Sequence, residues 1–254
     1  MKTRAGGPEL KEFGAHRSGT NFLRVILQEN YEVAVLTNTG GWKHGYYEVP
    51  KHLGREVDCA ICVKNPYAWI TSYYNFRNPK KEMPFAEYVR KPAIFEGVGQ
   101  RIECPNPMRF WVQMNEHWLS LELKERRKFL FRYENVLADP IGAVQELVRS
   151  LGLKRRQPLL YKVKRAVGLA GSEPRFFLPS IRLGAVPQKY KNCHIKSGEP
   201  FDAGRYTERK YLALFDPGSL EFINQQLDTS VLAQLSYPLI QVEELRNRPH
   251  PQAV

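Results

Sequence analysis

Apolar and polar residues follow two different periods along the chain, and the changes of period mark where strands give way to helices. Residues 10–13 form a short, apolar-leaning stretch of strand length. After a turn, apolar residues recur at helical spacing from residue 22 to residue 27. A short apolar run predicts a buried strand, whereas recurrence every three to four positions predicts a helix with one buried face. The beginning of the chain therefore predicts a strand, a tight turn and a helix.

The same alternation continues further along the chain. Residues 58–63 form a second apolar run, typical of a buried parallel strand. An aromatic-rich helix is expected from Pro107, and residues 129–136 begin with a buried strand. A helix follows with Asp139 as its cap, Pro140 at its first position and Gly152 as its stop. A further helix is expected after Asp216-Pro217, so the pattern predicts an α/β domain.

The first turn carries residues suited to holding an anion. Residues 14–19, which include two glycines, precede a helix whose first backbone N–H groups have no intrahelical partner. These donors and the helix dipole favour a negative ligand. Arg17 adds a permanent positive charge, and Ser18, Thr20 and Asn21 add short polar side chains. The pattern indicates a phosphate-binding loop, although an ordinary polar-capped connection shares part of it.

This loop is not a Walker A motif. Gly14 and Gly19 have the spacing of that motif, but Thr20-Asn21 follows where it has Lys and then Ser or Thr. The Lys that precedes the magnesium-binding hydroxyl in nucleotide kinases is therefore absent.

A second polar segment follows the strand predicted at residues 58–63. Lys64-Asn65-Pro66 stands at its carboxyl end, and Ser72 lies two helical turns further on. Ligands of open α/β sheets collect at the carboxyl ends of strands, so Lys64 is expected beside the first loop. A nucleotide kinase would have a metal-binding Asp at such a place. A Lys there indicates an anion site built without a metal.

Together the two segments resemble the donor-binding motifs of sulfotransferases that use 3′-phosphoadenosine 5′-phosphosulfate (PAPS). Residues 17–22, Arg-Ser-Gly-Thr-Asn-Phe, match the loop that holds the 5′-phosphosulfate. Lys64-Asn65-Pro66 with Ser72 matches the segment that holds the 3′-phosphate. Lys64 replaces the more usual Arg and so lacks its bidentate fork. Asn21 stands where the family frequently has Thr.

The resemblance extends to residues 129–140, where Tyr133 matches a tyrosine that lies by the adenine in that family. An ordinary half-buried aromatic is the simpler alternative for Tyr133. Residues similar in type to those of the family extend over residues 9–237. The resemblance implies a three-layer α/β sandwich around a mainly parallel sheet, with the architecture of P-loop kinases. It also places a basic loop over the 3′-phosphate, for which Lys191, Lys196 and Arg205 are the candidates.

Sulfuryl transfer needs positive charge at the leaving phosphate and a base that takes the proton of the acceptor. In sulfotransferases a Lys/His pair between the donor motifs commonly supplies both, which points to Lys43 and His44, with Arg17 adding charge. Histidine is the side chain best suited to proton transfer near neutrality. His16 and His52 are rival bases. The donor-binding set that the resemblance implies is Arg17, Ser18, Gly19, Thr20, Asn21, Phe22, Lys64, Ser72, Tyr133, Lys191 and Lys196, with no metal.

Composition sets the remaining bounds. A chain of 254 residues suits one domain over 1–254, in which residues 77–107 are expected to be a loop-rich insertion and possible acceptor lid, and residues 239–254 a flexible tail. No apolar run is long enough for a membrane span, and the N-terminus lacks the apolar segment of a signal peptide. Cys59 and Cys62 fall three apart on one strand, which disfavours a zinc knuckle. We expect a cytoplasmic protein.

Three functions stay open at this stage. A PAPS-dependent sulfotransferase acting on a small-molecule or carbohydrate acceptor explains both motifs, with 3′-phosphoadenosine 5′-phosphate as product and no nucleic-acid partner. A magnesium-dependent nucleotide or small-molecule kinase conflicts with the first loop and with Lys64. A non-catalytic polyanion binder would use the net charge of +12 but leaves the ordered motifs unexplained. The sequence identifies neither the acceptor nor the oligomeric state.

Overall fold

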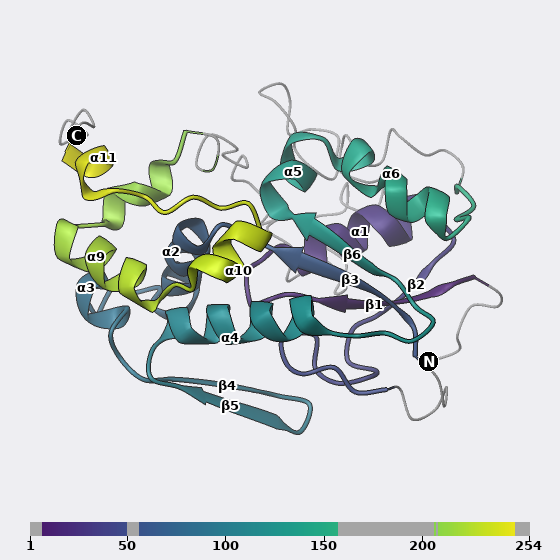
Figure 1. The fold of residues 1–254 in the computed structure, drawn as a ribbon, viewed down its shortest axis with the longest axis horizontal. Helices are drawn as coiled ribbons and strands as arrows, with labels where there is room; N and C mark the ends of the chain where they lie inside the picture. The colour runs from purple at the N-terminus through teal and green to yellow at the C-terminus, as the bar shows by residue number, and fades with distance from the viewer. Residues whose placement is uncertain (1–6, 50–55, 157–205, 207, 247–254) are drawn as a thin grey trace, which may run out of the picture.

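A parallel β-sheet of four strands forms the centre of the protein, which we describe from a computed structural model covering residues 7–49, 56–156, 206 and 208–246. The strands lie in the order β2 (Ala34–Leu36), β1 (Glu9–Phe13), β3 (Asp58–Val63) and β6 (Lys128–Arg132) (Figure 1). Each neighbouring pair is parallel, so all four carboxyl ends lie at one edge. The strands predicted at residues 10–13 and 58–63 are both present.

Helices cover both faces of this sheet. The helices α1 (Thr20–Asn30), α5 (Tyr133–Ala138) and α6 (Pro140–Ser150) share one apolar core with the sheet, and α2 (Pro66–Arg77), α4 (Pro107–Ser120) and α9 (Pro217–Gln226) share another. Figure 1 shows α5 and α6 on one side of the sheet and α4 on the other. In β3, Cys62 faces the first core and Cys59 the second, as expected for residues three apart. The predicted α/β three-layer fold is confirmed.

Residues 77–107 are more regular than the sequence predicted. They contain the short helix α3 (Phe85–Tyr88) and an antiparallel hairpin of β4 (Ala93–Gly97) and β5 (Gln100–Cys104). Along β4, buried Ala93 and Phe95 alternate with exposed Ile94 and Glu96. The prediction missed this hairpin because the surrounding prolines are typical of loops, while the strand alternation spans only five residues.

The C-terminal part ends in packed structure up to residue 246. After the 3-10 helix η4 (Lys210–Leu214) and α9 come α10 (Thr229–Gln234) and α11 (Val242–Arg246). Ile240 is buried, and its backbone N–H donates to the Tyr67 hydroxyl of α2 at 3.1 Å. The tail predicted from residue 239 is therefore wrong for residues 239–246, and residues 247–254 lie outside the described part.

The predicted helix ends agree with the local chemistry. The Asp139 carboxylate accepts from the Gly142 N–H at 2.9 Å at the start of α6, and Gly152 follows its end with φ +58°. The short helix α5 between β6 and α6 was not predicted. None of the described helices combines the length and apolar composition that crossing a membrane requires.

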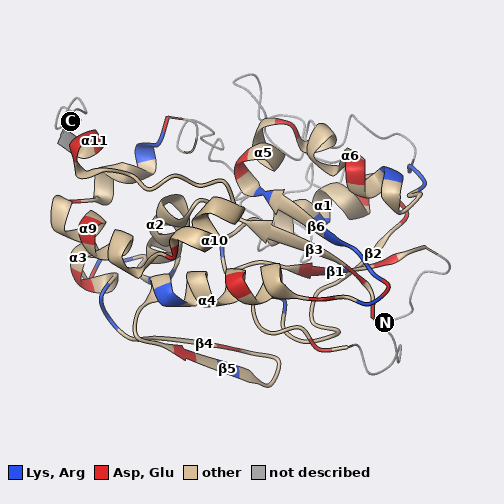
Figure 2. Cartoon of the chain, viewed as in Figure 1, with Lys and Arg blue, Asp and Glu red and all other residues tan. Residues whose placement is uncertain are grey.

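The excess positive charge is unevenly distributed along the sequence. Fourteen of the 38 Lys and Arg residues, but three of the 26 Asp and Glu residues, lie outside the described residues. Figure 2 shows acidic and basic residues interspersed on the described helices, including α4 and α6. The net charge of +12 is therefore mostly a property of the remaining sequence, largely residues 157–205.

Candidate active site

The sheet topology brings the two polar segments together. Strands β1 and β3 are neighbours, and Phe13 at the end of β1 pairs with Ile61 near the end of β3. The loop that follows β1 therefore lies beside Lys64, which directly follows β3. The Lys64 ammonium donates to the backbone carbonyl of Arg17 at 3.4 Å, so the two predicted anion-binding segments are in contact.

The first loop presents an uncapped helix N-terminus. Gly19 is the N-cap of α1 with φ +101°, and no side chain of the described residues caps the helix. The Ser18 hydroxyl oxygen is buried and has no hydrogen-bond partner in the part of the chain that the structure describes. A Cβ atom at Gly19 would collide with the Tyr133 ring, and one at Gly14 with the Cys62 carbonyl oxygen. These two glycines leave the loop the space and the backbone conformation that it needs, and the donors of α1 stay open to an anion.

Lys43 reaches this loop from the connection that follows β2. Its ammonium donates to the Asn21 side-chain oxygen at 2.7 Å and lies 3.4 Å from a carboxylate oxygen of Glu12. Arg24 of α1 approaches the same Glu12 oxygen at 3.8 Å and donates to Asn21 at 3.2 Å. Burial raises the pKa of Glu12, while the charges of Lys43 and Arg24 act in the opposite direction. Asn21, the residue that departs from the family pattern, thus connects Lys43 to the loop.

The second segment joins Lys64 to Ser72, as the spacing predicted. The ammonium of Lys64 donates to the Ser72 hydroxyl at 3.2 Å and to the Tyr206 hydroxyl at 3.0 Å. It also lies 4.4 Å from the centre of the Tyr133 ring and 4.3 Å from that of Tyr206. Lys64 is almost wholly buried, and this burial lowers its pKa, against the raising effects of Tyr206 and Glu134. An anion that replaced these partial charges would stabilise the ammonium further.

Tyr133 and Phe22 connect the two segments. Tyr133 begins α5 directly after β6, and its buried ring packs against Gly19 of the first loop. The Phe22 ring stands edge-on to it, with the ring centres 6.3 Å apart. Two aromatic rings beside both anion-binding segments would suit a flat heterocycle such as adenine.

His44 contacts the beginning of the first loop. Its Nδ1 is 2.5 Å from the Gly14 carbonyl oxygen, and a carbonyl can only accept, so Nδ1 carries the proton. The remaining nitrogen, Nε2, then holds a lone pair that can accept a proton. Burial, followed by the charges of His16 and Lys43, lowers the pKa of His44 well below its usual value. His44 is therefore uncharged at neutral pH, which a general base must be.

Arg17 has a backbone φ of +68°, and its guanidinium lies over the Phe76 ring of α2 at 5.1 Å. The predicted rival base His16 is stacked on His44, with ring centres 4.1 Å apart. Lys191, Lys196, Arg205 and His52 lie outside the described residues. Thus the predicted site residues that the structure describes gather at the carboxyl ends of β1, β3 and β6.

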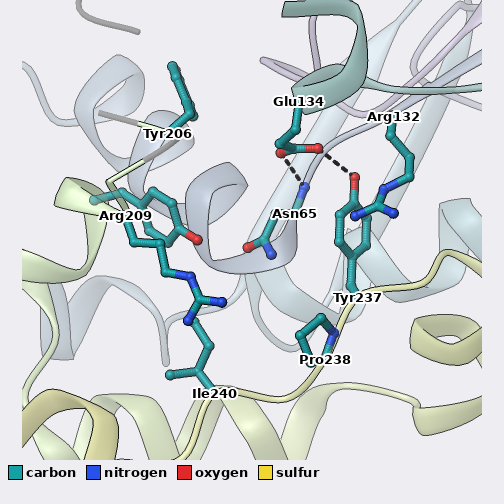
Figure 3. Close-up of a pocket in the computed structure, with 9 residues that line it drawn as sticks. Asn65, Arg132, Glu134, Tyr206, Arg209, Tyr237, Pro238 and Ile240 are labelled. Carbon is teal, nitrogen blue, oxygen red and sulfur yellow. Dashed lines mark hydrogen bonds between the residues drawn. The ribbon is translucent and has the colours of Figure 1, made fainter. Parts of the chain in front are cut away.

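A pocket of about 180 Å³ is lined by Asn65, the residue that follows Lys64 (Figure 3). The Glu134 carboxylate connects two of the lining residues. It accepts from the Asn65 backbone N–H at 3.0 Å and from the Tyr237 hydroxyl at 2.8 Å. Arg132 and Arg209 also line this pocket. Because Asn65 follows Lys64 directly, Glu134 holds the backbone of the second segment in place.

Sequence reasoning missed three residues that contact this site. Glu12 had a detectable signal, since it is a charged residue inside the strand that leads into the loop. Glu134 follows Tyr133 within residues 129–140, a segment in which the resemblance implied a role for Tyr133 alone. Tyr206 had no local signal, because it meets Lys64 across 142 positions of the sequence.

The fold and the two segments define an α/β protein in which two predicted anion-binding loops are adjacent. A family model described as the sulfotransferase domain matches residues 46–166, a little under half of the chain. This match bears out the predicted resemblance over residues 46–166, which are similar to a sulfotransferase domain. The matched range includes Lys64, Ser72 and Tyr133 but begins after the first loop, Lys43 and His44. A comparison with curated proteins found no match.

Proposed function

We propose that this sulfotransferase-family protein uses PAPS as donor and transfers a sulfuryl group to a hydroxyl or amine of its acceptor. The observation that carries the proposal is the contact between two anion-binding segments on neighbouring strands. One offers the N-terminus of α1 and the Ser18 hydroxyl, which have no side-chain cap and no hydrogen-bond partner among the described residues. The other offers Lys64 bonded to Ser72. Two separate anion sites fit a ligand with two phosphate positions better than they fit a monophosphate.

The donor would be held by the residues that the sequence predicted. Residues 17–22 would bind the 5′-phosphosulfate, Lys64 and Ser72 the 3′-phosphate, and Phe22 and Tyr133 would flank the adenine. PAPS, when bound, supplies an activated sulfuryl group with a phosphate as its leaving group. Lys43 lies against the first loop and would stabilise negative charge there, assisted by Arg17. Lys191 and Lys196 are proposed to close over the 3′-phosphate.

His44 is proposed as the base that takes the proton of the acceptor. Its Nδ1–H is held by the Gly14 carbonyl, so the lone pair of Nε2 has a defined direction. The low pKa of His44 leaves this lone pair free over the neutral range. Because Gly14 begins the first loop, the base and the 5′ anion site share one segment of backbone. This proximity suits proton removal beside the sulfuryl group.

A magnesium-dependent kinase is the competing function. Among the described residues, no group of three or more His, Cys, Asp or Glu side chains is placed to hold a metal ion. Lys64 occupies the strand end where a kinase would have a metal-binding Asp. We favour the sulfotransferase because the loop chemistry and the family match agree. We also propose a cytoplasmic location and a small-molecule or carbohydrate acceptor.

A transfer assay tests the proposal. Purified protein is incubated with PAPS and pools of hydroxyl and amine acceptors, and sulfated product is followed by mass spectrometry with and without a metal chelator. We expect product in both conditions and almost none with His44→Ala. Phosphorylated product from ATP-magnesium, with none sulfated from PAPS, would establish the kinase instead.

A further inference from the structure

Two imidazole rings are stacked at the edge of the proposed active site. The ring centres of His16 and His44 are 4.1 Å apart and their planes differ by 27°. His16 belongs to the first loop and His44 to the connection that follows β2, so two separate segments build the pair. Only His44 has a place in the proposed chemistry, and the presence of a second imidazole against it needs its own explanation.

Aromatic neighbours surround the His16 ring. Its backbone carbonyl accepts from the Trp69 indole N–H of α2 at 2.5 Å, which fixes the loop at this residue. The Trp42 ring lies edge-on to the His16 ring at 5.0 Å, and the Phe95 ring lies tilted to it at 5.8 Å. The Nδ1 of His16 is buried, and no described residue forms a hydrogen bond with it. His16 therefore acts as a flat wall against which the second ring rests.

The pair also has an electrostatic consequence. Two imidazoles this close cannot both be charged without strong repulsion, so protonation of one disfavours protonation of the other. The charged groups that act on the two rings are Arg77 of α2, Lys11 of β1, and the loop residues Arg17 and Lys43. All four are cationic and oppose a further positive charge. Burial is the largest cause and lowers the pKa of His16 to about 4.

We infer that His16 is a positioning residue for His44: its ring covers one face of the His44 imidazole and fixes the plane in which Nδ1 of His44 donates to Gly14. Its function as a support for a base rests on the proposed function, whereas its effect on the His44 ring does not. The effect can therefore be measured without any enzyme assay.

The test is a pH titration of the full chain labelled with ¹⁵N-histidine, followed by NMR. In the wild type we expect His44 as the Nδ1–H tautomer, with its protonation displaced to low pH. In His16→Ala, water reaches the exposed ring face, so His44 should titrate at higher pH and lose its single tautomer. His16→Phe keeps a flat apolar ring but removes the second charge, so it should retain the tautomer and shift the titration less. His117→Ala is the matched control, because His117 lies on α4 against Tyr46.

Unchanged tautomer and titration of His44 in folded His16→Ala would overturn the inference, even if sulfotransferase activity is found. A shift of equal size in His117→Ala would overturn it as well. Once an acceptor is known, the acidic limb of kcat/KM should move to higher pH in His16→Ala. Loss of activity at every pH in both His16→Ala and His16→Phe, with activity retained in His44→Ala, would make His16 the base and contradict its positioning role.

Discussion

At the scale of single residues, Lys64 shows how a cation can be buried without contact to an acidic side chain of the described residues. Its ammonium is surrounded by two hydroxyls, a carbonyl and two aromatic rings, which carry only partial negative charge. Such a group is desolvated in advance and gains most when an anion arrives. The residue is therefore expected to distinguish ligands by their charge at this one position.

Replacing Lys64 by Met tests this expectation, since Met keeps much of the side-chain volume and removes the charge. Loss of a charge-assisted hydrogen bond worth roughly 1.5–3 kcal/mol should weaken adenosine 3′,5′-bisphosphate about 10- to 150-fold. Adenosine 5′-monophosphate should bind almost as before. Calorimetry of both ligands measures the difference, and equal losses would show that Lys64 does not contact the 3′-phosphate.

His44 is the residue whose removal should affect turnover and not donor binding. Loss of one general base lowers kcat by about 10²- to 10⁴-fold. We expect His44→Ala to behave in this way, with the bisphosphate affinity unchanged because the proposed base acts on the acceptor and not on the donor. His117→Ala, a second partly buried histidine, should keep wild-type turnover. Near-normal kcat in His44→Ala would contradict the assignment.

At the scale of elements, the loop between β1 and α1 depends on glycine. Gly19 combines φ +101° with a Tyr133 ring where a Cβ would stand, whereas Gly152 has φ +58° and open space around it. Gly152→Ala should cost about 1–2 kcal/mol of unfolding free energy for the left-handed backbone alone. Gly19→Ala should cost a further 1–3 kcal/mol or so for the collision and should also weaken nucleotide binding. Urea unfolding of both variants measures these two losses of unfolding free energy. Equal losses would mean that the Tyr133 ring moves aside without a cost in stability.

The same scale explains what could be predicted from the sequence. Strands β1 and β3 and helices α1, α2 and α6 were predicted because their apolar periods and caps are local signals. The joining of Lys64 to Ser72 followed from helical spacing. The β4–β5 hairpin was missed because prolines dominate residues 77–107. The contacts of Tyr206 with Lys64 and of Ile240 with Tyr67 depend on long-range packing, which no local pattern encodes.

At the scale of the whole molecule, the stacked histidines should make the protein sensitive to acid. The pKa of His16 is about 4 in the folded protein and 6.5 in its ordinary environment. Because the folded-state pKa is depressed, the unfolded chain binds the proton first as pH falls. The contribution of His16 to the free energy of unfolding is therefore complete above pH 6.5 and is lost as pH falls toward 4. Each such proton changes stability by up to about 1.4 kcal/mol per pH unit in this window.

His16→Phe should therefore lower the dependence of the unfolding free energy on pH between about 6.5 and 4, because one of the two protons no longer takes part. Urea unfolding at several pH values gives the slope for the wild type and for the variant. Identical slopes would show that the His16 proton is taken up equally by the folded and unfolded chain.

The central claim is that this fold carries two protein-built anion sites for a 3′,5′-bisphosphorylated nucleotide. Isothermal titration of the purified chain with adenosine 3′,5′-bisphosphate, in the presence of a metal chelator, tests it most directly. We predict one nucleotide per chain, bound more tightly than adenosine 5′-monophosphate and with no effect of added magnesium. Binding of ATP that requires magnesium, together with no binding of the bisphosphate, would contradict the account.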